Sequence, residues 1–384
     1  MTGRVFFYVQ SLLGLGHVVR GMRIAHALRE RGFVVDLALG GRPISGLEAN
    51  DLNIVQLTPV KAGAGGFSDL VTLSGQSAGP ELKATRRREL LTAFADRAPD
   101  VLLIETFPFG RRQMRFELIP LLETAHARRP RPLVVSSIRD ILQENRKPSR
   151  SEETIEVLRH YFDHVIIHGA PEFVRLEATF PLAHQIASMT SYSGLIGPNS
   201  LGADGAGSHT ADVVAWAGGG AVGRLLLEAA VLAKPRTTLA ASRWLVVTGP
   251  NVGAADFAQL KRLALQNDVR LERFVANLPR VLQHAQLAIS QAGYNSVADV
   301  LSARCRAVLT PYAEHGETEQ SRRAALLEER GLAVVVSETE LTPDTLAAAV
   351  DRALVAPNAA VALDLGGATR TADILESLLR RRPG

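Results

Sequence analysis

A histidine that follows a pair of glycines is the first residue of this chain with clear chemical potential. It is His17, in the segment Gly14-Leu15-Gly16-His17. Its ordinary pKa lies closer to physiological pH than that of other side chains, so it can remove a proton from a hydroxyl group. A plain dinucleotide-binding loop is disfavoured, because its fingerprint requires a third glycine where Val19 stands. We predict a catalytic or ligand-contacting His17; a histidine that only bonds its own loop is the alternative.

A second chemically suggestive segment is the turn Ser290-Gln291-Ala292-Gly293. An apolar run precedes it, and a helical pattern begins at Asn295. The order strand, glycine turn and helix places backbone N–H groups and the positive end of a helix dipole at the turn, which suits a diphosphate. Asp299, six residues beyond Gly293, could accept hydrogen bonds from a ribose diol. The segment therefore predicts a nucleotide-binding turn.

Further glycines stand at the ends of other predicted strands. Gly218, Gly219 and Gly220 are consecutive, which allows a backbone to approach a ligand closely, and Arg224 could reach a phosphate. Gly249 ends another strand and is interpreted as the wall of a binding cleft. A flexible hinge is the alternative for the glycine triplet. The P-loop signature does not occur, so a P-loop NTPase is not supported.

Neither a metal centre nor a disulfide framework is expected. The chain has one cysteine, Cys305, which fits a reducing compartment. His164 and His168 are four residues apart, but the apolar residues between them indicate a strand, on which they lie too far apart to bind one ion. We therefore predict that both histidines are structural.

The length and the rhythm of the chain predict two α/β domains. A chain of 384 residues exceeds one ordinary core. Strand, glycine turn, helix and strand succeed one another within the first 40 residues, which indicates a parallel sheet. A Gly, Pro and Ser-rich stretch interrupts the rhythm, which then restarts. The expected organisation is an N-terminal Rossmann-like domain at 1–195, a linker at 196–210, a C-terminal Rossmann-like domain at 211–367, and a helix with a basic tail at 368–384.

The net charge of +4 lies in the first 200 residues, which hold 24 Lys and Arg against 20 Asp and Glu. The basic runs are Arg86 to Arg88, Arg111 to Arg115 and Arg128 to Arg129. We interpret them as solvated helix faces, with attraction to anionic lipid or an anionic acceptor as the alternative. No aromatic platform accompanies them, so nucleic-acid binding is not expected.

No apolar run approaches the ~20 residues of a membrane span. The expected location is cytoplasmic, or peripheral at the inner face of the membrane.

These motifs together resemble a known family, the GT-B glycosyltransferases of the MurG type (glycosyltransferase family 28). The likeness also extends to a group of bacterial predicted glycosyltransferases that share Phe-Pro-Phe-Gly-Arg-Arg, residues 107–112 here. It implies the GT-B architecture, in which two Rossmann-like doubly wound parallel-sheet domains face each other across a cleft. The C-terminal domain would hold a nucleotide sugar, and the N-terminal domain would hold the acceptor.

The resemblance also implies roles for individual residues. The residues assigned to the donor nucleotide and diphosphate are Gly16, Gly218, Gly219, Gly220, Arg224, Gly249, Ser290, Gln291, Ala292, Gly293, Asn295 and Asp299. Glu319 and Gln320 would bind hydroxyls of the donor sugar. The sequence departs from the family at Asp299, where a longer glutamate is typical. The implied reaction transfers a hexose or N-acetylhexosamine from a UDP-linked donor to an acceptor hydroxyl, without a metal or other cofactor.

In the mechanism we expect, His17, or Glu105 in its place, deprotonates the acceptor hydroxyl, which attacks the anomeric carbon. Helix N-terminal amides and Arg224 stabilise the departing nucleoside diphosphate. Two alternatives remain. A nucleotide-sugar hydrolase of the PseG type would use water as the attacking group, and a non-catalytic protein would bind the nucleotide sugar without turnover. Phe107, Phe109 and the nearby arginines suggest an acceptor at a membrane, or else a packed loop.

Overall fold

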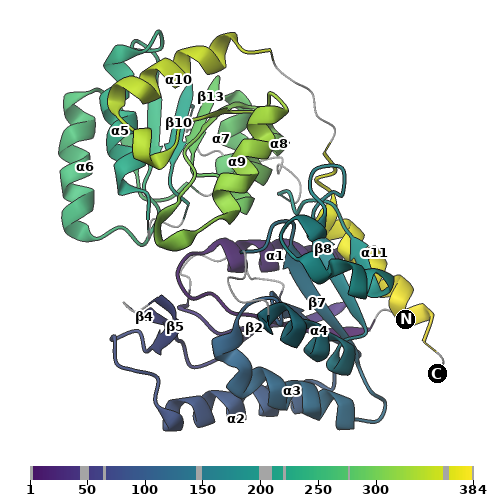
Figure 1. Cartoon of the computed structure of the whole chain (residues 1–384). Helices are drawn as coiled ribbons and strands as arrows, with labels where there is room; N and C mark the ends of the chain where they lie inside the picture. Colours follow the sequence, from purple (N-terminus) through teal and green to yellow (C-terminus); the bar gives the residue numbers. More distant parts are fainter. Residues whose placement is uncertain are drawn as a thin grey trace. The chain divides into compact units, whose positions relative to one another are not determined.

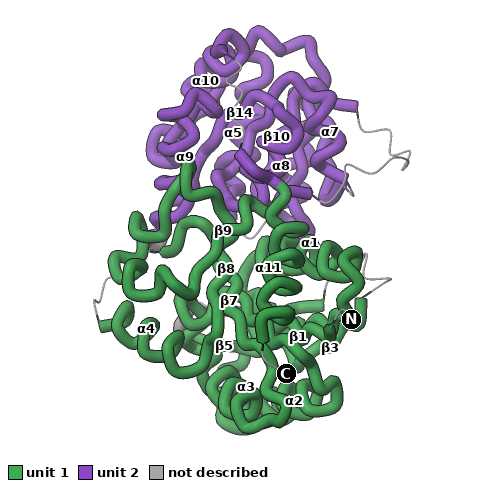
Figure 2. Tube along the Cα trace, turned by 90° about the vertical axis from the view of Figure 1, so that its right-hand side faces the viewer, with its two compact units in different colours: residues 1–196, 366–384 green, residues 197–365 purple. Residues whose placement is uncertain are grey.

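A computed structural model gives the fold of the chain as two compact units. The described residues are 3–43, 52–63, 66–143, 149–198, 210–218, 222–275, 277–357 and 363–382. One unit comprises residues 1–196 and 366–384, and the other comprises residues 197–365. Figure 2 colours the first unit green and the second purple. The chain therefore passes from one unit to the other near Ile196 and returns near Gly366.

The first unit is built on a parallel sheet, shown in Figure 1. Its strands are β1 (Arg4–Val9), β2 (Val34–Leu39), β3 (Asn53–Gln56), β6 (Val101–Glu105), β7 (Leu133–Arg139), β8 (His164–His168) and β9 (Thr190–Tyr192). Their order is β3-β2-β1-β6-β7-β8-β9, and every pair is parallel. The predicted doubly wound sheet is confirmed. The sequence did not predict β9 or the antiparallel hairpin of β4 (Lys61–Gly63) and β5 (Gly66–Val71).

The helices of the first unit include one from the end of the chain. They are α1 (Gly16–Glu30), α2 (Pro80–Arg97), α3 (Arg115–Ala127), α4 (Ser149–Tyr161) and α11 (Gly367–Arg380). Helix α11, yellow in Figure 1, packs beside α1, and Arg31 at the end of α1 pairs with Asp373 and Glu376 of α11 at 2.8 and 2.9 Å. The predicted C-terminal helix is thus part of the first unit.

The second unit repeats the same design. Its strands are β10 (Val213–Trp216), β11 (Trp244–Val247), β12 (Val269–Glu272), β13 (Leu287–Ser290), β14 (Arg306–Leu309) and β15 (Val334–Val335), in the parallel order β12-β11-β10-β13-β14-β15. Its helices are α5 (Arg224–Ala233), α6 (Ala254–Gln266), α7 (Leu278–His284), α8 (Tyr294–Ala303), α9 (Glu319–Glu329) and α10 (Pro343–Val355). Most of the linker predicted at 196–210 lies outside the described residues.

The strand order reverses once in each sheet. In the first unit the chain steps outward on either side of β1, so the reversal lies between β1 and β6; in the second it lies between β10 and β13. Ligands of doubly wound proteins bind at such switch points, beyond the carboxyl ends of the strands. The central strands are mostly apolar because helices cover both faces of the sheet; Val5 to Val9, for example, are fully buried.

Arg86 is not on the solvated face that the sequence predicted for its run, whereas Arg87 and Arg88 are exposed as predicted. Arg86 of α2 is fully buried, and its Nε and Nη2 donate hydrogen bonds to the two carboxylate oxygens of Glu117 at 2.9 and 2.7 Å. Nη2 also donates to Gln10 Oε1 at 2.9 Å, and Tyr8 donates to Glu117 at 2.6 Å. The network ties α2 and α3 to the end of β1, because a buried charge requires a partner of opposite sign.

The two histidines of β8 have the structural role that the sequence predicted. His164 Nε2 lies 2.9 Å from the Ser191 hydroxyl. His168 is fully buried, and its two ring nitrogens lie 2.6 Å from Ser137 Oγ and 2.9 Å from Ser193 Oγ. Burial lowers the pKa of His168 from 6.5 to about 3. His168 is therefore held neutral between two hydroxyl groups.

Replacing Arg86 with methionine should destabilise the first unit by about 3–5 kcal/mol, because it leaves the Glu117 carboxylate buried without its cation. Arg87→Met, at an exposed position of the same helix, is the control and should change the unfolding free energy by less than about 0.5 kcal/mol. Urea unfolding followed by circular dichroism measures both. Equal stabilities of the two variants would contradict the importance of the buried pair.

The pH dependence of the unfolding free energy should reveal that His168 is neutral in the folded protein. Its pKa is lower in the folded than in the unfolded chain, so the unfolded chain binds more protons, and the unfolding free energy falls as the pH drops from about 6.5 towards 3. Between pH 7 and 5 the wild type should lose about 2 kcal/mol more than His168→Gln. Denaturant titrations at the two pH values measure the difference, and the exposed His184→Gln should behave as the wild type does. Parallel losses in wild type and His168→Gln would refute the assignment.

Candidate functional site

His17 and Glu105 meet at the switch point of the first unit. His17 lies in the first turn of α1, which follows β1, and Glu105 is the last residue of the neighbouring strand β6. The imidazole Nδ1 lies 2.8 Å from a carboxylate oxygen of Glu105. The Glu105 side chain is fully buried, whereas 19% of the His17 side chain is exposed. The two residues that the sequence indicated as candidate bases therefore form one hydrogen-bonded pair.

The contact with Glu105 determines the tautomer of His17. An ionised carboxylate only accepts hydrogen bonds. Nδ1 of His17 therefore carries the hydrogen and donates a hydrogen bond to Glu105, while Nε2 keeps its lone pair. Burial, the largest influence, lowers the pKa of His17 from 6.5 to about 3, although Glu105 acts in the opposite direction. His17 is therefore neutral near pH 7. Its Nε2 can accept a proton, and Glu105 would stabilise the imidazolium that results.

Glu105 is better suited to orient His17 than to replace it. Arg20, of which only 2% is exposed, also donates to the Glu105 carboxylate. Burial alone would raise the pKa of Glu105, but His17 and Arg20 outweigh it and hold the pKa well below its ordinary value. The Glu105 carboxylate has no exposed surface and already accepts hydrogen bonds from His17 and Arg20, whereas the His17 side chain is partly exposed. We therefore prefer His17 as the base, and the choice between the two residues remains a prediction.

Two arginines at this site were not among the predicted site residues. Arg20 lies three residues after His17 on α1, a spacing that places both on one helix face and was visible in the sequence. Arg111 follows β6, and its Nε donates to the backbone oxygen of Gln10 at 3.0 Å. Its backbone adopts a φ of 59°, a left-handed conformation uncommon for residues other than glycine. No sequence signal distinguished Arg111 from the nearby Arg112 and Arg115.

The loop after Glu105 is packed, in agreement with one of the two interpretations left open for residues 105–115. Phe107 is buried, and the rings of Phe109 and Phe180 meet edge to face at 5.1 Å. Arg112 and Arg115 both pair with Glu153 of α4. One carboxylate thus balances one of the two positive charges, and an anionic acceptor at this run remains a prediction.

The predicted nucleotide turn lies at the switch point of the second unit. Trp216 at the end of β10 is the register partner of Ser290 at the end of β13, so the two glycine loops leave the sheet side by side. A Cβ atom added at Gly293 or at Gly218 would meet no atom within 4 Å, and Gly218 has a φ of 55°. The open space beside both backbones allows a ligand to approach them closely. Gly219 and Gly220 lie outside the described residues.

The helices that follow these loops have ends suited to an anion. The N-termini of α5 and α8 carry neither a side-chain cap nor an acidic residue in the first turn. Gly223, the N-cap of α5, has a φ of 98°, and an added Cβ would lie 2.5 Å from Ala217 Cβ and 2.9 Å from Gln291 Nε2. Only glycine fits there, which brings α5 close to the turn. Uncapped N–H groups and aligned helix dipoles favour a diphosphate at this edge.

Two other residues predicted to bind the donor nucleotide have defined positions in the second unit. Arg224 begins α5, but its guanidinium donates to Glu228, Asp256 and Gln259 at 2.8, 2.5 and 2.9 Å. A guanidinium has five N–H donors, and these contacts use one on each nitrogen, so a phosphate contact remains a prediction. Asp299 is 8% exposed in the second turn of α8.

The remaining predicted residues lie in loops or first helical turns that follow strands. Gln291 and Ala292 are buried within the turn, Asn295 is half-buried in the first turn of α8, and Gly16 is the first residue of α1. Gly249 follows β11 with a φ of 85°, and its N–H donates to the Arg273 oxygen at 3.0 Å. These positions agree with the expected strand ends, while their ligand contacts remain predictions.

Glu319 and Gln320 both make contacts within the second unit. Glu319, the first residue of α9, is 3% exposed, and Arg323 donates to it at 2.9 Å. Gln320 is half-buried, and its Oε1 accepts a hydrogen bond from Tyr312 N at 3.1 Å. Glu319 is therefore buried and Gln320 is only half-buried, although the sequence assigned both residues to the donor sugar.

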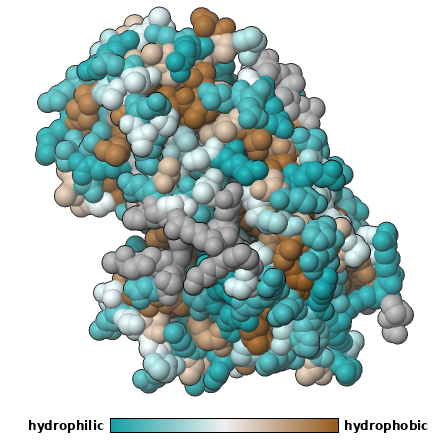
Figure 3. Space-filling model, viewed as in Figure 1, coloured by the Kyte–Doolittle hydropathy of each residue, from teal (hydrophilic) through white to brown (hydrophobic). Residues whose placement is uncertain are grey.

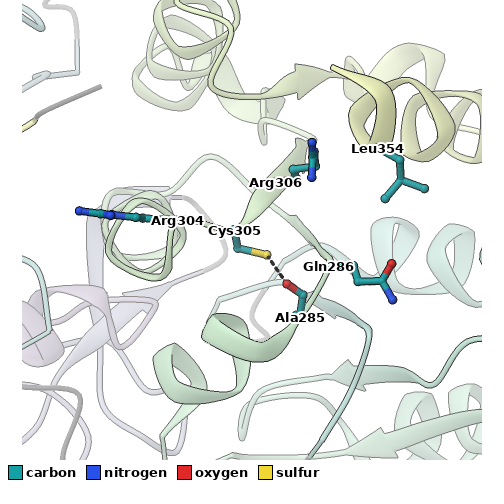
Figure 4. Close-up of a pocket in the computed structure, with 6 residues that line it drawn as sticks. All are labelled: Ala285, Gln286, Arg304, Cys305, Arg306 and Leu354. Carbon is teal, nitrogen blue, oxygen red and sulfur yellow. Dashed lines mark hydrogen bonds between the residues drawn. The ribbon is translucent and has the colours of Figure 1, made fainter. Parts of the chain in front are cut away.

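A pocket of about 400 Å³ lies elsewhere in the second unit. Ala285 and Gln286 before β13, Arg304 to Arg306 at the start of β14, and Leu354 of α10 line it, as Figure 4 shows. These residues lie at the amino ends of the strands, opposite the switch-point edge. The thiol of Cys305 donates to the Ala285 oxygen at 3.5 Å, and burial raises the pKa of Cys305 to about 12. The pocket therefore contains none of the predicted site residues.

Among the described residues, no helix combines the length and the apolar character required to span a membrane. On the face shown in Figure 3, apolar side chains (brown) are interspersed with polar ones (teal).

Comparison with known proteins supports the resemblance seen in the motifs. Residues 214–374 match the family model "Glycosyltransferase family 28 C-terminal domain". The chain is similar to UDP-N-acetylglucosamine–N-acetylmuramyl-(pentapeptide) pyrophosphoryl-undecaprenol N-acetylglucosamine transferases. The protein of Levilactobacillus brevis is 29% identical over 171 residues, 42% of this chain and 47% of that one. The protein of Exiguobacterium sibiricum is 30% identical over 118 residues, 30% of this chain and 32% of that one. The matches thus span less than half the length of these relatives.

Solved structures agree on the fold. The crystal structure of the calicheamicin glycosyltransferase has a TM-score of 0.62 at 16% identity and covers 100% of both chains. MurG of Acinetobacter baumannii has a TM-score of 0.62 at 15% identity, with 97% of this chain and 99% of that one covered. The two doubly wound units, the family model and these structures lead to one conclusion. The chain has the GT-B fold, and its residues 214–374 match the C-terminal domain of glycosyltransferase family 28.

Proposed function

We propose that this protein transfers a hexose or N-acetylhexosamine from a UDP-linked donor to an acceptor hydroxyl. One observation carries the proposal: the family 28 match covers residues 214–374, and the uncapped glycine turn at Gly293 lies within it, at the switch point of the sheet. The similar proteins are named for UDP-N-acetylglucosamine as donor, which supports this choice of sugar nucleotide.

The donor half of the proposal rests on the turn before α8 and the start of α5. Backbone amides at Gly293 and Gly218 would hold the diphosphate in the open space beside them. Asp299 would bind the ribose through its carboxylate. Amides and helix dipoles supply the positive potential that a leaving diphosphate requires, so we propose transfer without a metal ion or other cofactor.

The acceptor half rests on His17. Its Nε2 would remove the proton from the acceptor hydroxyl as the oxygen attacks the anomeric carbon of the donor sugar. The bond from that carbon to the diphosphate oxygen breaks, and the nucleoside diphosphate departs with the electron pair. Glu105, 2.8 Å from Nδ1, would stabilise the positive charge that develops on the imidazole.

The acceptor itself is proposed from the relatives. Their names specify a pyrophosphoryl-undecaprenol acceptor. We propose a membrane-associated acceptor for this chain too, reached from the cytoplasmic face by a protein that binds the membrane peripherally.

A variant at Gly293 should separate donor binding from folding. UDP-N-acetylglucosamine at 100 times its dissociation constant should stabilise the wild type by roughly 2.7 kcal/mol. Gly293→Val should keep its stability without ligand, since an added Cβ would meet no protein atom within 4 Å, yet it should lose the ligand response, because it fills the proposed diphosphate space. Gly79→Val is a matched control: Gly79 also caps a helix, α2, with a φ of −65° and open space at Cβ. Thermal unfolding measures all three, and an equal response of Gly293→Val and wild type would exclude the turn as the donor site.

His17→Ala should lower the rate of transfer by about 10²–10⁴-fold and leave donor affinity unchanged, because it removes only the general base. UDP release is measured with and without a bacterial polar-lipid extract as acceptor source, and EDTA should not change the rate. His26→Ala, half-buried on the same helix, is the control.

The same assay distinguishes the alternatives. UDP release that needs no added acceptor would favour a hydrolase, and binding without any release would favour a non-catalytic protein. Full activity of His17→Ala would remove the base assignment.

A further inference from the structure

We propose that Glu319 and Arg323 form a buried clamp that orients the nucleotide turn, and that Glu319 does not bind the donor sugar. The inference rests on the proposed function, because it concerns how the donor is held. It also assigns a role to Arg323, which lies one helical turn beyond Glu319 on α9. The name clamp denotes these two residues.

The clamp connects α9 to the turn between β13 and α8. Arg323 is fully buried, and its Nη2 donates to Glu319 Oε1 at 2.9 Å. Its Nη1 donates to the backbone oxygen of Ala292 at 3.1 Å. The guanidinium also lies over the ring of Tyr294, 5.6 Å from its centre. Arg323 thus contacts the residues on both sides of Gly293.

Holding the Ala292 oxygen orients the next N–H group. A trans peptide is planar, so the C=O of Ala292 and the N–H of Gly293 point in opposite directions. Because Arg323 holds the oxygen on the protein side, the Gly293 N–H is directed away from Arg323. Among the described residues, no acceptor receives a hydrogen bond from this N–H, and the space beside Gly293 is open. The clamp thereby aims a backbone donor at the proposed diphosphate position.

Glu319 makes the clamp possible. A buried guanidinium is tolerated only with an anion beside it, and Glu319 supplies that charge at 3% exposure. The carboxylate also lies in the first turn of α9, where the helix dipole favours it. A carboxylate already engaged in a buried ion pair is poorly placed to bind sugar hydroxyls.

Gln320 is better placed to contact the sugar. Its Oε1 accepts from Tyr312 N at 3.1 Å, which leaves the side-chain NH₂ group as the part that can reach a ligand. Within the described part of the chain, that NH₂ group has no hydrogen-bond acceptor. We therefore assign the sugar contact to Gln320 and the positioning of the turn to the clamp.

Affinities for UDP and for UDP-N-acetylglucosamine separate the two roles. Calorimetric titration of Glu319→Gln and Arg323→Met should show both ligands weakened by the same factor, about tenfold or 1.4 kcal/mol. The double variant should bind no worse than the weaker single one, because the two residues act as a unit. Gln320→Ala should weaken UDP-N-acetylglucosamine and leave UDP unchanged. Arg322→Met, the adjacent half-buried arginine, is the control and should change neither.

A measurement without ligand keeps the inference testable if the donor proves to be a different nucleotide. Hydrogen exchange of peptides spanning residues 289–296 should accelerate in Arg323→Met and in Glu319→Gln, but not in Arg322→Met. Unchanged exchange in these peptides would overturn the clamp. Loss of UDP-N-acetylglucosamine binding with intact UDP binding in Glu319→Gln would instead make Glu319 a sugar ligand. If the wild type binds no nucleotide, the proposed function fails, while the exchange result still decides whether the clamp exists.

Discussion

The burial of charge is the constraint on which this structure depends. Arg20, Arg86 and Arg323 are among its largest fully buried side chains, and each lies against a buried glutamate. Removing two charges from water is costly, so each pair persists only where hydrogen bonds satisfy both groups. All three pairs lie near the carboxyl ends of parallel strands, where helix N-termini and loops must be held in defined orientations. The buried pairs hold these loops in place.

Each pair serves a different segment. Arg20 and Glu105 hold the ring of His17, so the tautomer with a lone pair on Nε2 follows from one buried carboxylate. The Arg86 network anchors the end of β1, from which the glycine loop of His17 departs. Arg323 fixes a peptide plane in the turn of the second unit. Transfer chemistry of the proposed kind needs such preorganisation, because dipoles that are already aligned need no reorganisation during the reaction.

Much of the fold could be read from the sequence, for definite reasons. Strands covered on both faces appear as unbroken apolar runs, and the alternation of strand, glycine turn and helix indicates parallel crossover units. The positions of Gly14 to His17 and of Ser290 to Gly293 at strand ends follow from the same rhythm. The hairpin β4–β5 and the short strand β9 were not predicted, because three-residue strands such as β4 and β9 carry too few apolar positions for a recognisable period.

By itself, the sequence determined which residues stand at strand ends, and hence that His17 and the turn at Gly293 could serve a ligand. Only the tertiary structure decided what those residues touch. Arg86 looks like a surface charge, and its partner Glu117 is 31 residues away; Glu105 is 85 residues from Arg20. Local patterns carry no information about partners that meet through packing of separate helices and strands. Burial then decides the chemistry, because the same carboxylate is a base in water and a fixed counter-charge inside the protein.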